Sequence, residues 1–360
     1  MQEKKGIASA AGLTNIFLGI ITTFVVIIVL MEIKSILIPI TFAVILTFLF
    51  HPVVLYAQKF KIPRFVSIIV ILFLVFIAAY MLLLILVSSL QSISAKSAFY
   101  GERFELLMLT ILEPFNLTIH EFFSLLNIED DKNILNEVVE KLFSTGIVQQ
   151  TFVSVSSFIG DVLIILIFWL FMIFGKSKFD LKLKSAFGSS GDGVFSTINK
   201  INEQVQSYIF IKTIISFGTA FICTIILFLF GVDFALLFGF LTFTLNYIPN
   251  VGSLVATIFP LTIVLLQFGF GFYSIIIISL LGLNQFIVGN FIEPHYLGKH
   301  LNLSPVFVLF SLILWGWLWG ITGMFLAVPI AAILKIVFAS IDALKPLAIL
   351  MGSNTEELNL

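Results

Sequence analysis

The chain has 360 residues, of which 60% are hydrophobic and only 11% are charged, with a formal net charge of −1. Because soluble domains carry about 25% charged residues, this composition excludes an ordinary soluble domain. Its apolar runs reach the roughly 20 residues that cross a bilayer and lack the period-two alternation of a membrane β-barrel, so they predict an all-α polytopic membrane protein.

Six apolar segments are predicted to cross the membrane as full helices. They are Leu13–Met31, Ser35–Ala57, Phe65–Leu90, Ile147–Phe174, Tyr208–Gly231 and Phe272–Phe291. Lysines and arginines gather before the first segment, between the second and third, and after the fourth. These flanks all share one side of the membrane, and an excess of basic residues marks the cytoplasmic side. The N-terminus is therefore predicted to be cytoplasmic.

Polar segments divide the chain into predicted parts. Residues 91–146 form an acidic external insert with amphipathic helices, which is either a cap on the membrane surface or an oligomer contact. The "GSSGDG" turn of residues 175–207 lacks the Gly-Lys-Ser/Thr ending of a phosphate loop, so nucleotide binding is not predicted. The parts are 1–90 (three transmembrane helices), 91–146, 147–174 (the fourth helix), 175–207 (a cytoplasmic basic and amphipathic segment), 208–345 (a transport core) and 346–360 (a cytoplasmic tail).

The stretch "NYIPNVGS", Asn246–Ser253, interrupts an apolar segment. Pro249 blocks continuation of a helix, and Gly252 tolerates the backbone angles of a turn. Asn246 and Asn250 offer amide groups that hold the turn or bind a ligand. The two arms have only about fifteen residues each, which is short for a full crossing. We expect a re-entrant hairpin entered from outside, with two full crossings as the alternative.

A second interruption lies at "GITGM", Gly320–Met324, between "SPVFVLFSLILWGWLW" and "FLAVPIAAILKIVFASI". It predicts another broken hairpin, entered from inside, after which Lys335 and Lys345 place the C-terminus in the cytoplasm. Paired Gly- or Pro-interrupted segments indicate the substrate site of a transporter, because broken backbone at membrane depth needs protein or water around it. The alternative is that each turn is satisfied by its own side chains.

Three motifs occur in a fixed order: "NYIPNVGS", "NFIEPHYLGKHLNLSP" and "GITGMFLAVPIAAILK". In order and spacing they resemble the C-terminal half of the autoinducer-2 exporter family, also called PerM-like. The resemblance implies an integral transporter of a bacterial or archaeal plasma (inner) membrane that works as an oligomer. It also implies either export of autoinducer-2 or exchange of sodium or lithium for protons, since members of the family are linked to both.

Polar, proline and glycine residues of the two interruptions, and of the span between them, form the predicted substrate path. They are Asn246, Pro249, Asn250, Gly252, Ser253, Gln285, Asn290, Glu293, Pro294, Gly320, Gly323 and Pro329. Asp161, inside the fourth span, is predicted either to couple transport to a proton or cation or to hydrogen-bond neighbouring helices. Glu293 is expected to cap a helix, to pair with Lys299 or to gate the path. Lys212, a turn into the fifth span, is expected to snorkel to the interface.

The sequence favours a secondary transporter that exports a small polar solute, such as an autoinducer-2-like signal, by alternating access. A sodium or lithium/proton antiporter is one alternative. A passive channel is another, although it needs a continuous polar lining that isolated polar residues do not supply. No nucleophile–base set points to an enzyme, and Cys223 alone forms neither a disulfide nor a metal site. The expected partners are the bilayer, a small-molecule or ion substrate and further copies of the chain; no nucleic acid, cofactor or metal is expected.

Overall fold

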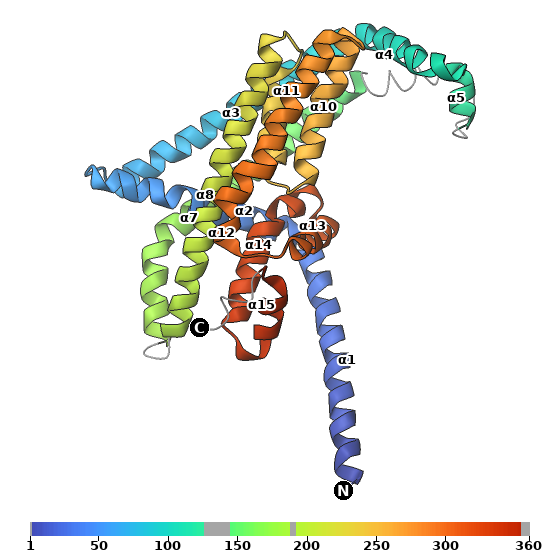
Figure 1. Ribbon diagram of the computed structural model, residues 1–360. Coiled ribbons are helices and arrows are strands. Elements are labelled where there is room, and N and C mark those ends of the chain that lie inside the picture. The colour runs from blue at the N-terminus through green and yellow to red at the C-terminus, as the bar shows by residue number, and fades with distance from the viewer. Residues whose placement is uncertain (1, 126–144, 188–191, 354–360) are drawn as a thin grey trace. The chain divides into compact units, whose positions relative to one another are not determined.

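The computed structural model describes residues 2–125, 145–187 and 192–353, and these ranges are almost entirely helical (Figure 1). Among them no β-strand occurs, and the one extended pairing recorded is an isolated bridge between Leu303 and Gly352. The all-α fold class predicted from composition is confirmed.

The helices differ widely in length. They are α1 (Gln2–Glu32), α2 (Lys34–Lys59), α3 (Arg64–Ala95), α4 (Ser97–Leu112), α5 (Ile119–Leu125), α7 (Thr145–Phe187), α8 (Asp192–Leu229), α9 (Ala235–Leu245), α10 (Val251–Phe268), α11 (Phe272–Ile287), α12 (Glu293–Leu301), α13 (Pro305–Trp319), α14 (Ile321–Ala339) and α15 (Lys345–Met351). Short 3₁₀ turns cover Glu113–Phe115 and Asp342–Leu344, and a π-helix, Val288–Ile292, joins α11 to α12.

Seven helices in the described part of the chain are long and apolar enough to cross a membrane: α2, α3, α7, α8, α10, α11 and α14. Five of them contain predicted full spans, and the remaining predicted span, Leu13–Met31, lies within α1. The other two, α10 and α14, are the second arms of the two predicted hairpins. Their first arms, α9 and α13, are apolar but shorter, at 11 and 15 residues.

Two helices extend well beyond the predicted spans. The fourth span was expected to end at Phe174, but α7 continues to Phe187. The predicted fifth span begins at Tyr208, but α8 begins at Asp192 and runs unbroken over 38 residues, so it includes the amphipathic stretch before that span. The physical reason is that "KINEQVQS" holds no proline or glycine to end a helix, so a polar and an apolar stretch propagate as one.

The first expected helix of the external insert is confirmed as α4. A capping box begins α5: the Thr118 N–H donates to the Glu121 carboxylate at 2.8 Å, and the Glu121 N–H donates to Thr118 Oγ1 at 3.2 Å. These hydrogen bonds to the charged form lower the pKa of Glu121. The second expected helix of the insert, near Ile134–Leu142, falls outside the described residues.

The helices group into two compact units that interleave along the sequence. One comprises Met1–Phe48, Ile164–Val205 and Asn302–Leu360, and the other comprises Leu49–Leu163 and Gln206–Leu301. The second unit buries a core between α8, α9, α10 and α11 that includes Leu227, Phe238, Val264, Ile277 and Leu281. Gly239 lets α9 approach α8, since a Cβ there would lie 1.8 Å from Thr224 Oγ1.

The first unit is centred on the α13–α14 hairpin. The rings of Trp315 and Trp319 pack with centroids 4.7 Å apart, and the Trp319 indole donates to the Leu30 carbonyl of α1 at 3.0 Å. Within the hairpin the Ser311 hydroxyl donates to the Ala327 carbonyl at 2.9 Å. Aromatic packing, with each polar group matched to one acceptor, holds this unit together.

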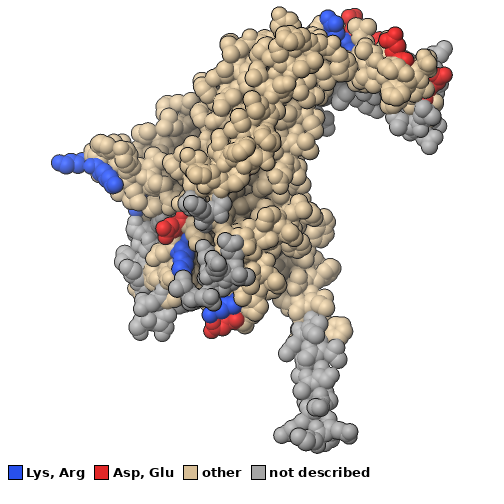
Figure 2. Space-filling model, viewed as in Figure 1, with Lys and Arg blue, Asp and Glu red and all other residues tan. Residues whose placement is uncertain are grey.

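Charged side chains occupy only a few separate spots on the face drawn in Figure 2, and the rest of the described surface there is uncharged. Large apolar side chains such as Phe171, Phe228 and Leu229 are three-quarters exposed in the isolated chain. Exposed apolar area on this scale marks a surface that meets lipid or another protein.

Candidate functional site

A stripe of polar residues runs along the buried face of α8 in the second unit. Tyr208, Lys212, Ser216, Thr219 and Cys223 are spaced four, four, three and four residues apart, which places them on one side of the helix. All five are buried. We call this set the α8 stripe. The fifteen residue-to-residue steps from Tyr208 to Cys223 extend over about 22 Å, most of the thickness of a bilayer core.

An ion pair lies near the start of the α8 stripe. Lys212 Nζ contacts Glu293 Oε1, and the lysine side chain is only 2% exposed. The expectation that Lys212 snorkels to the interface is therefore wrong. Because the Glu293 carboxylate compensates its charge, the ammonium group turns inward instead. The expected pairing of Glu293 with Lys299 stays a prediction, because the side chain of Lys299 is not among those described.

The π-helix Val288–Ile292 directly precedes Glu293. A π-turn inserts one extra residue, which rotates everything after it by about 100° relative to a continuous α-helix. This irregularity therefore decides which way the Glu293 carboxylate points. Such single π-turns are frequent at functional sites in other proteins.

The turn between α9 and α10 meets α8 through hydrogen bonds. Asn246 Nδ2 donates to Ser216 Oγ at 3.1 Å. The Tyr247 hydroxyl lies 2.6 Å from Thr213 Oγ1, and Thr213 donates its own proton to the Ile209 carbonyl. Since a hydroxyl carries one proton, Tyr247 is the donor to Thr213. The interrupted segment is thus docked on α8 by two polar contacts.

A third group of contacts joins α11 to α8. Asn284 Nδ2 donates to the Thr219 carbonyl at 3.1 Å, and both residues are buried. The Thr242 hydroxyl of α9 reaches Cys223 Sγ at 3.5 Å. The space that Cys223, Asn284 and Gln285 share leaves no room for a water molecule. Packed side chains therefore leave no open space beside the α8 stripe around Cys223.

The predicted path residues of the first hairpin and of α11 divide into three groups. Asn246 and Glu293 join the α8 stripe, and Gln285 borders the tight space beside it. Pro249 and Asn250 lie in the turn itself, and Gly252 and Ser253 lie in the first turn of α10, where Gly252 is buried. Asn290 and Pro294 are exposed, and the Asn290 amide donates to its own helix at Phe286.

The predicted path residues of the second hairpin lie in the first unit. Gly320 makes the turn between α13 and α14 with φ +66°, while Gly323 and Pro329 are buried within α14. The break is therefore confined to Gly320 rather than spread over "GITGM", since Ile321–Met324 is helical. Asp161 is exposed on α7, and no hydrogen bond or ion pair is recorded for it among the described residues.

Sequence reasoning missed the residues of the α8 stripe and also Asn284 as members of this site. Their spacing was a usable signal on α8, because polar residues at intervals of three and four inside an apolar helix share a face. Asn284 was passed over for Gln285 and Asn290. Which of these amides points inward depends on the rotation of α11 and on the π-turn that follows it.

A separate charged cluster lies at the other end of the second unit. Asp233 Oδ2 accepts from Lys96 Nζ and from the Tyr100 hydroxyl, each at 2.5 Å. Burial and the neighbouring Asp233 carboxylate raise the pKa of Tyr100. The Asp233 N–H donates to Gln267 Oε1 at 3.0 Å. These contacts tie helix α4 to both ends of the α9–α10 hairpin.

A helical bundle of this hydrophobicity, with a buried polar stripe and two broken hairpins, belongs to the class of polytopic membrane transporters. The family described as AI-2E family transporter matches residues 16–343, and this chain belongs to that family. It is 26% identical to the "AI-2 transport protein TqsA" of Escherichia coli strain K12, across 90% of this chain and 91% of that protein. It is also 26% identical to a "Putative transport protein" of Borreliella burgdorferi, across 88% and 84%.

Proposed function

We propose that this protein is a secondary transporter that exports a small polar solute of the autoinducer-2 kind by alternating access. The observation that carries the proposal is the α8 stripe with its buried Lys212–Glu293 pair. Charged groups within membrane spans are costly and usually functional. The relationship to a protein named for autoinducer-2 transport supports the choice of solute. We place the protein in the inner membrane, with both termini cytoplasmic and as an oligomer.

The groups of the α8 stripe suit a hydroxylated, uncharged solute. Ser216 and Thr213 supply hydroxyls, and Asn246 and Asn284 supply amides that donate and accept. Each now bonds to another protein group, so a solute enters by exchanging one set of hydrogen bonds for another. Such an exchange costs little free energy, which favours repeated turnover over tight binding.

The two ends of the stripe suggest how access alternates. Lys212 and Glu293 lie near its start, at the end predicted to face the cytoplasm. Beyond Cys223 the same face of α8 continues into the apolar core around Leu227 and Phe238. In the proposed cycle the ion pair and the turn of the first hairpin separate to admit solute. The apolar core then opens on the other side.

Flux into proteoliposomes tests this proposal. A candidate solute is supplied with a pH or sodium gradient, and counterflow of labelled against unlabelled solute separates a carrier from a passive channel. We expect Glu293→Gln to reduce flux at least tenfold. Glu203→Gln, at an exposed glutamate of α8, is the control and keeps full activity. Equal flux in both variants refutes a role for the ion pair.

The same observation favours a second candidate, a sodium or lithium/proton antiporter. A small cation and the Lys212 ammonium compete for the Glu293 carboxylate, so cation binding releases the lysine. Proton movement driven by sodium or lithium, and lost in Glu293→Gln, supports this candidate over solute export. The variant Asp161→Asn tests the predicted coupling carboxylate. Gradient-dependent flux that persists in Asp161→Asn removes that residue from the coupling mechanism.

A further inference from the structure

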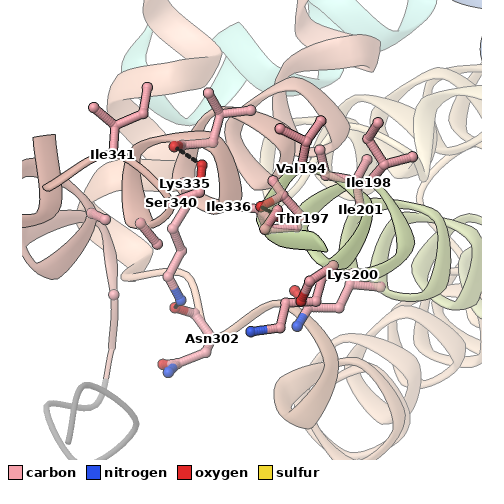
Figure 3. Close-up of a pocket in the computed structure, with 17 residues that line it drawn as sticks. Val194, Thr197, Ile198, Lys200, Ile201, Asn302, Lys335, Ile336, Ser340 and Ile341 are labelled. Atoms are coloured by element: carbon pink, nitrogen blue, oxygen red, sulfur yellow. Dashed lines mark hydrogen bonds between the residues drawn. The ribbon is translucent and has the colours of Figure 1, made fainter. Parts of the chain in front are cut away.

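A pocket of about 740 Å³ opens in the first unit, and none of the residues that line it belongs to the α8 stripe. Figure 3 shows side chains from the start of α8, including Thr197, Lys200 and Ile201, on one side of it. Lys335, near the end of α14, and Ser340, directly after it, lie on the other side. Asn302 lies between the two sides. Its volume is in the range of small-molecule sites.

The charged side chains among the described residues that line the pocket are both lysines. The described residues that line it include Lys200 and Lys335 but neither an aspartate nor a glutamate. Lys335 Nζ donates to the Asn302 carbonyl at 2.6 Å, and Asn302 Oδ1 accepts from the Ser353 N–H at 3.1 Å. Lys335 is therefore held in place by Asn302, which is itself held by Ser353. Lys200 extends from α8. Two cations facing one cavity favour an anion.

Two residues that line the pocket, Thr197 and Ser340, have hydroxyl groups whose protons are already donated to nearby backbone carbonyls. Thr197 Oγ1 donates its proton to the Gly193 carbonyl at 2.9 Å, and Ser340 Oγ donates to the Val337 carbonyl at 2.7 Å. Each oxygen keeps lone pairs that accept from a ligand O–H. Apolar side chains such as Ile198 and Ile336 line the remaining wall. The lining thus combines cations, hydrogen-bond acceptors and a surface for carbon.

We propose that this pocket binds a small phosphate ester that carries free hydroxyl groups. The phosphate lies against Lys200 and Lys335, its hydroxyls donate to Thr197 and Ser340, and its carbon atoms rest on the isoleucines. The head group of an anionic glycerophospholipid and a soluble sugar or glycerol phosphate share this chemistry. The site is independent of the proposed solute path and goes beyond it, because it selects a charged ligand.

Titration calorimetry with the full-length protein in a neutral detergent tests the proposal, with glycerol 3-phosphate as the probe and glycerol as the uncharged control. We expect saturable binding of the phosphate ester and none of glycerol. Lys200→Gln should weaken binding about tenfold or more, the effect of losing one charge-assisted hydrogen bond. Lys182→Gln, an exposed lysine on α7, is the matched control and should leave affinity unchanged.

A second measurement separates the two sources of the ligand. The titration is repeated in nanodiscs of phosphatidylcholine with and without phosphatidylglycerol. Loss of glycerol phosphate binding when phosphatidylglycerol is present identifies a lipid head group as the natural occupant, and unchanged binding identifies a soluble ester. Absence of saturable binding in both preparations, or equal affinity in wild type and Lys200→Gln, overturns the proposal. Because no flux is measured, neither result depends on the proposed transport.

Discussion

The α9–α10 and α13–α14 hairpins close in the same way. A Cβ on Gly252 would lie 1.7 Å from the Leu245 carbonyl oxygen, and a Cβ on Gly323 would lie 1.9 Å from that of Trp315. In each hairpin a glycine in the first turn of the second arm therefore packs on the last turns of the first arm. Two segments with little sequence identity share one closure because only glycine permits so close an approach.

The two hairpins differ in what holds them. The turn of the first, through Asn246 and Tyr247, hydrogen-bonds to hydroxyls on α8. The second is held by the packed rings of Trp315 and Trp319 and by a hydrogen bond inside the hairpin. Polar contacts can be exchanged for a solute, whereas aromatic packing resists rearrangement. We therefore propose that the first hairpin is the one that moves and contacts the solute.

The largest expected effect comes from breaking the ion pair beside the first hairpin. Lys212→Met leaves the Glu293 carboxylate without its cation, which should cost about 3–5 kcal/mol of stability. Thermal unfolding in detergent measures this loss. The double variant Lys212→Met/Glu293→Met should recover most of the stability without recovering transport. Ser311→Ala in the second hairpin, which removes one neutral hydrogen bond, should cost only about 1 kcal/mol. If Lys212→Met is as stable as the wild type, the proposed difference between the two hairpins is contradicted.

Next in size is the shared glycine closure. Gly252→Ala and Gly323→Ala each force a backbone shift and should cost about 1–3 kcal/mol, measured as a fall in the unfolding temperature. Gly218→Ala is the control, since a Cβ on that α8 residue meets nothing within 4 Å. It should be neutral or slightly stabilising, because alanine favours helix. A loss confined to one of the two hairpins shows that they do not close alike.

A smaller effect concerns the turn residues themselves. Gly320 has φ +66° and ψ −147°, and Asn250 has φ +60° and ψ −55°; both conformations are rare for residues with a side chain. Gly320→Ala should therefore cost about 1–3 kcal/mol, while Asn250→Gly should be neutral or gain up to about 1 kcal/mol. Chemical denaturation of the two variants measures whether each change lowers or raises the free energy of unfolding. Destabilisation by Asn250→Gly indicates that the asparagine side chain, not the turn geometry, matters there.

The smallest expected effect tests the aromatic anchor of the second hairpin. Trp319→Phe keeps a ring against Trp315 but removes the indole donor to the Leu30 carbonyl. The loss should be about 1 kcal/mol, seen as a small fall in unfolding temperature. Solute flux should not change, since this contact lies outside the proposed path. A large loss of flux would indicate that the second hairpin takes part in transport.

The sequence alone determined the helices and the breaks between them. Long apolar runs admit only helix in a bilayer, and Pro249 and Gly320 end helices through their own backbone preferences. The same local reasoning identified Asn246 and Glu293 as members of the site. These features depend on residues close together in the chain, so spacing and residue type suffice to predict them.

The tertiary structure alone decided which of these residues meet. Lys212 and Glu293 are 81 residues apart in the sequence. Their contact depends on the packing of α8 and on a π-turn that the residue spacing did not predict. The choice of Asn284 over Gln285 and Asn290 as the buried amide likewise follows from the rotation of α11. A side chain that snorkels and one that pairs have the same sequence context. The free-energy difference between snorkelling and pairing comes from a partner residue on another helix, and only the packing of the helices brings that partner into contact.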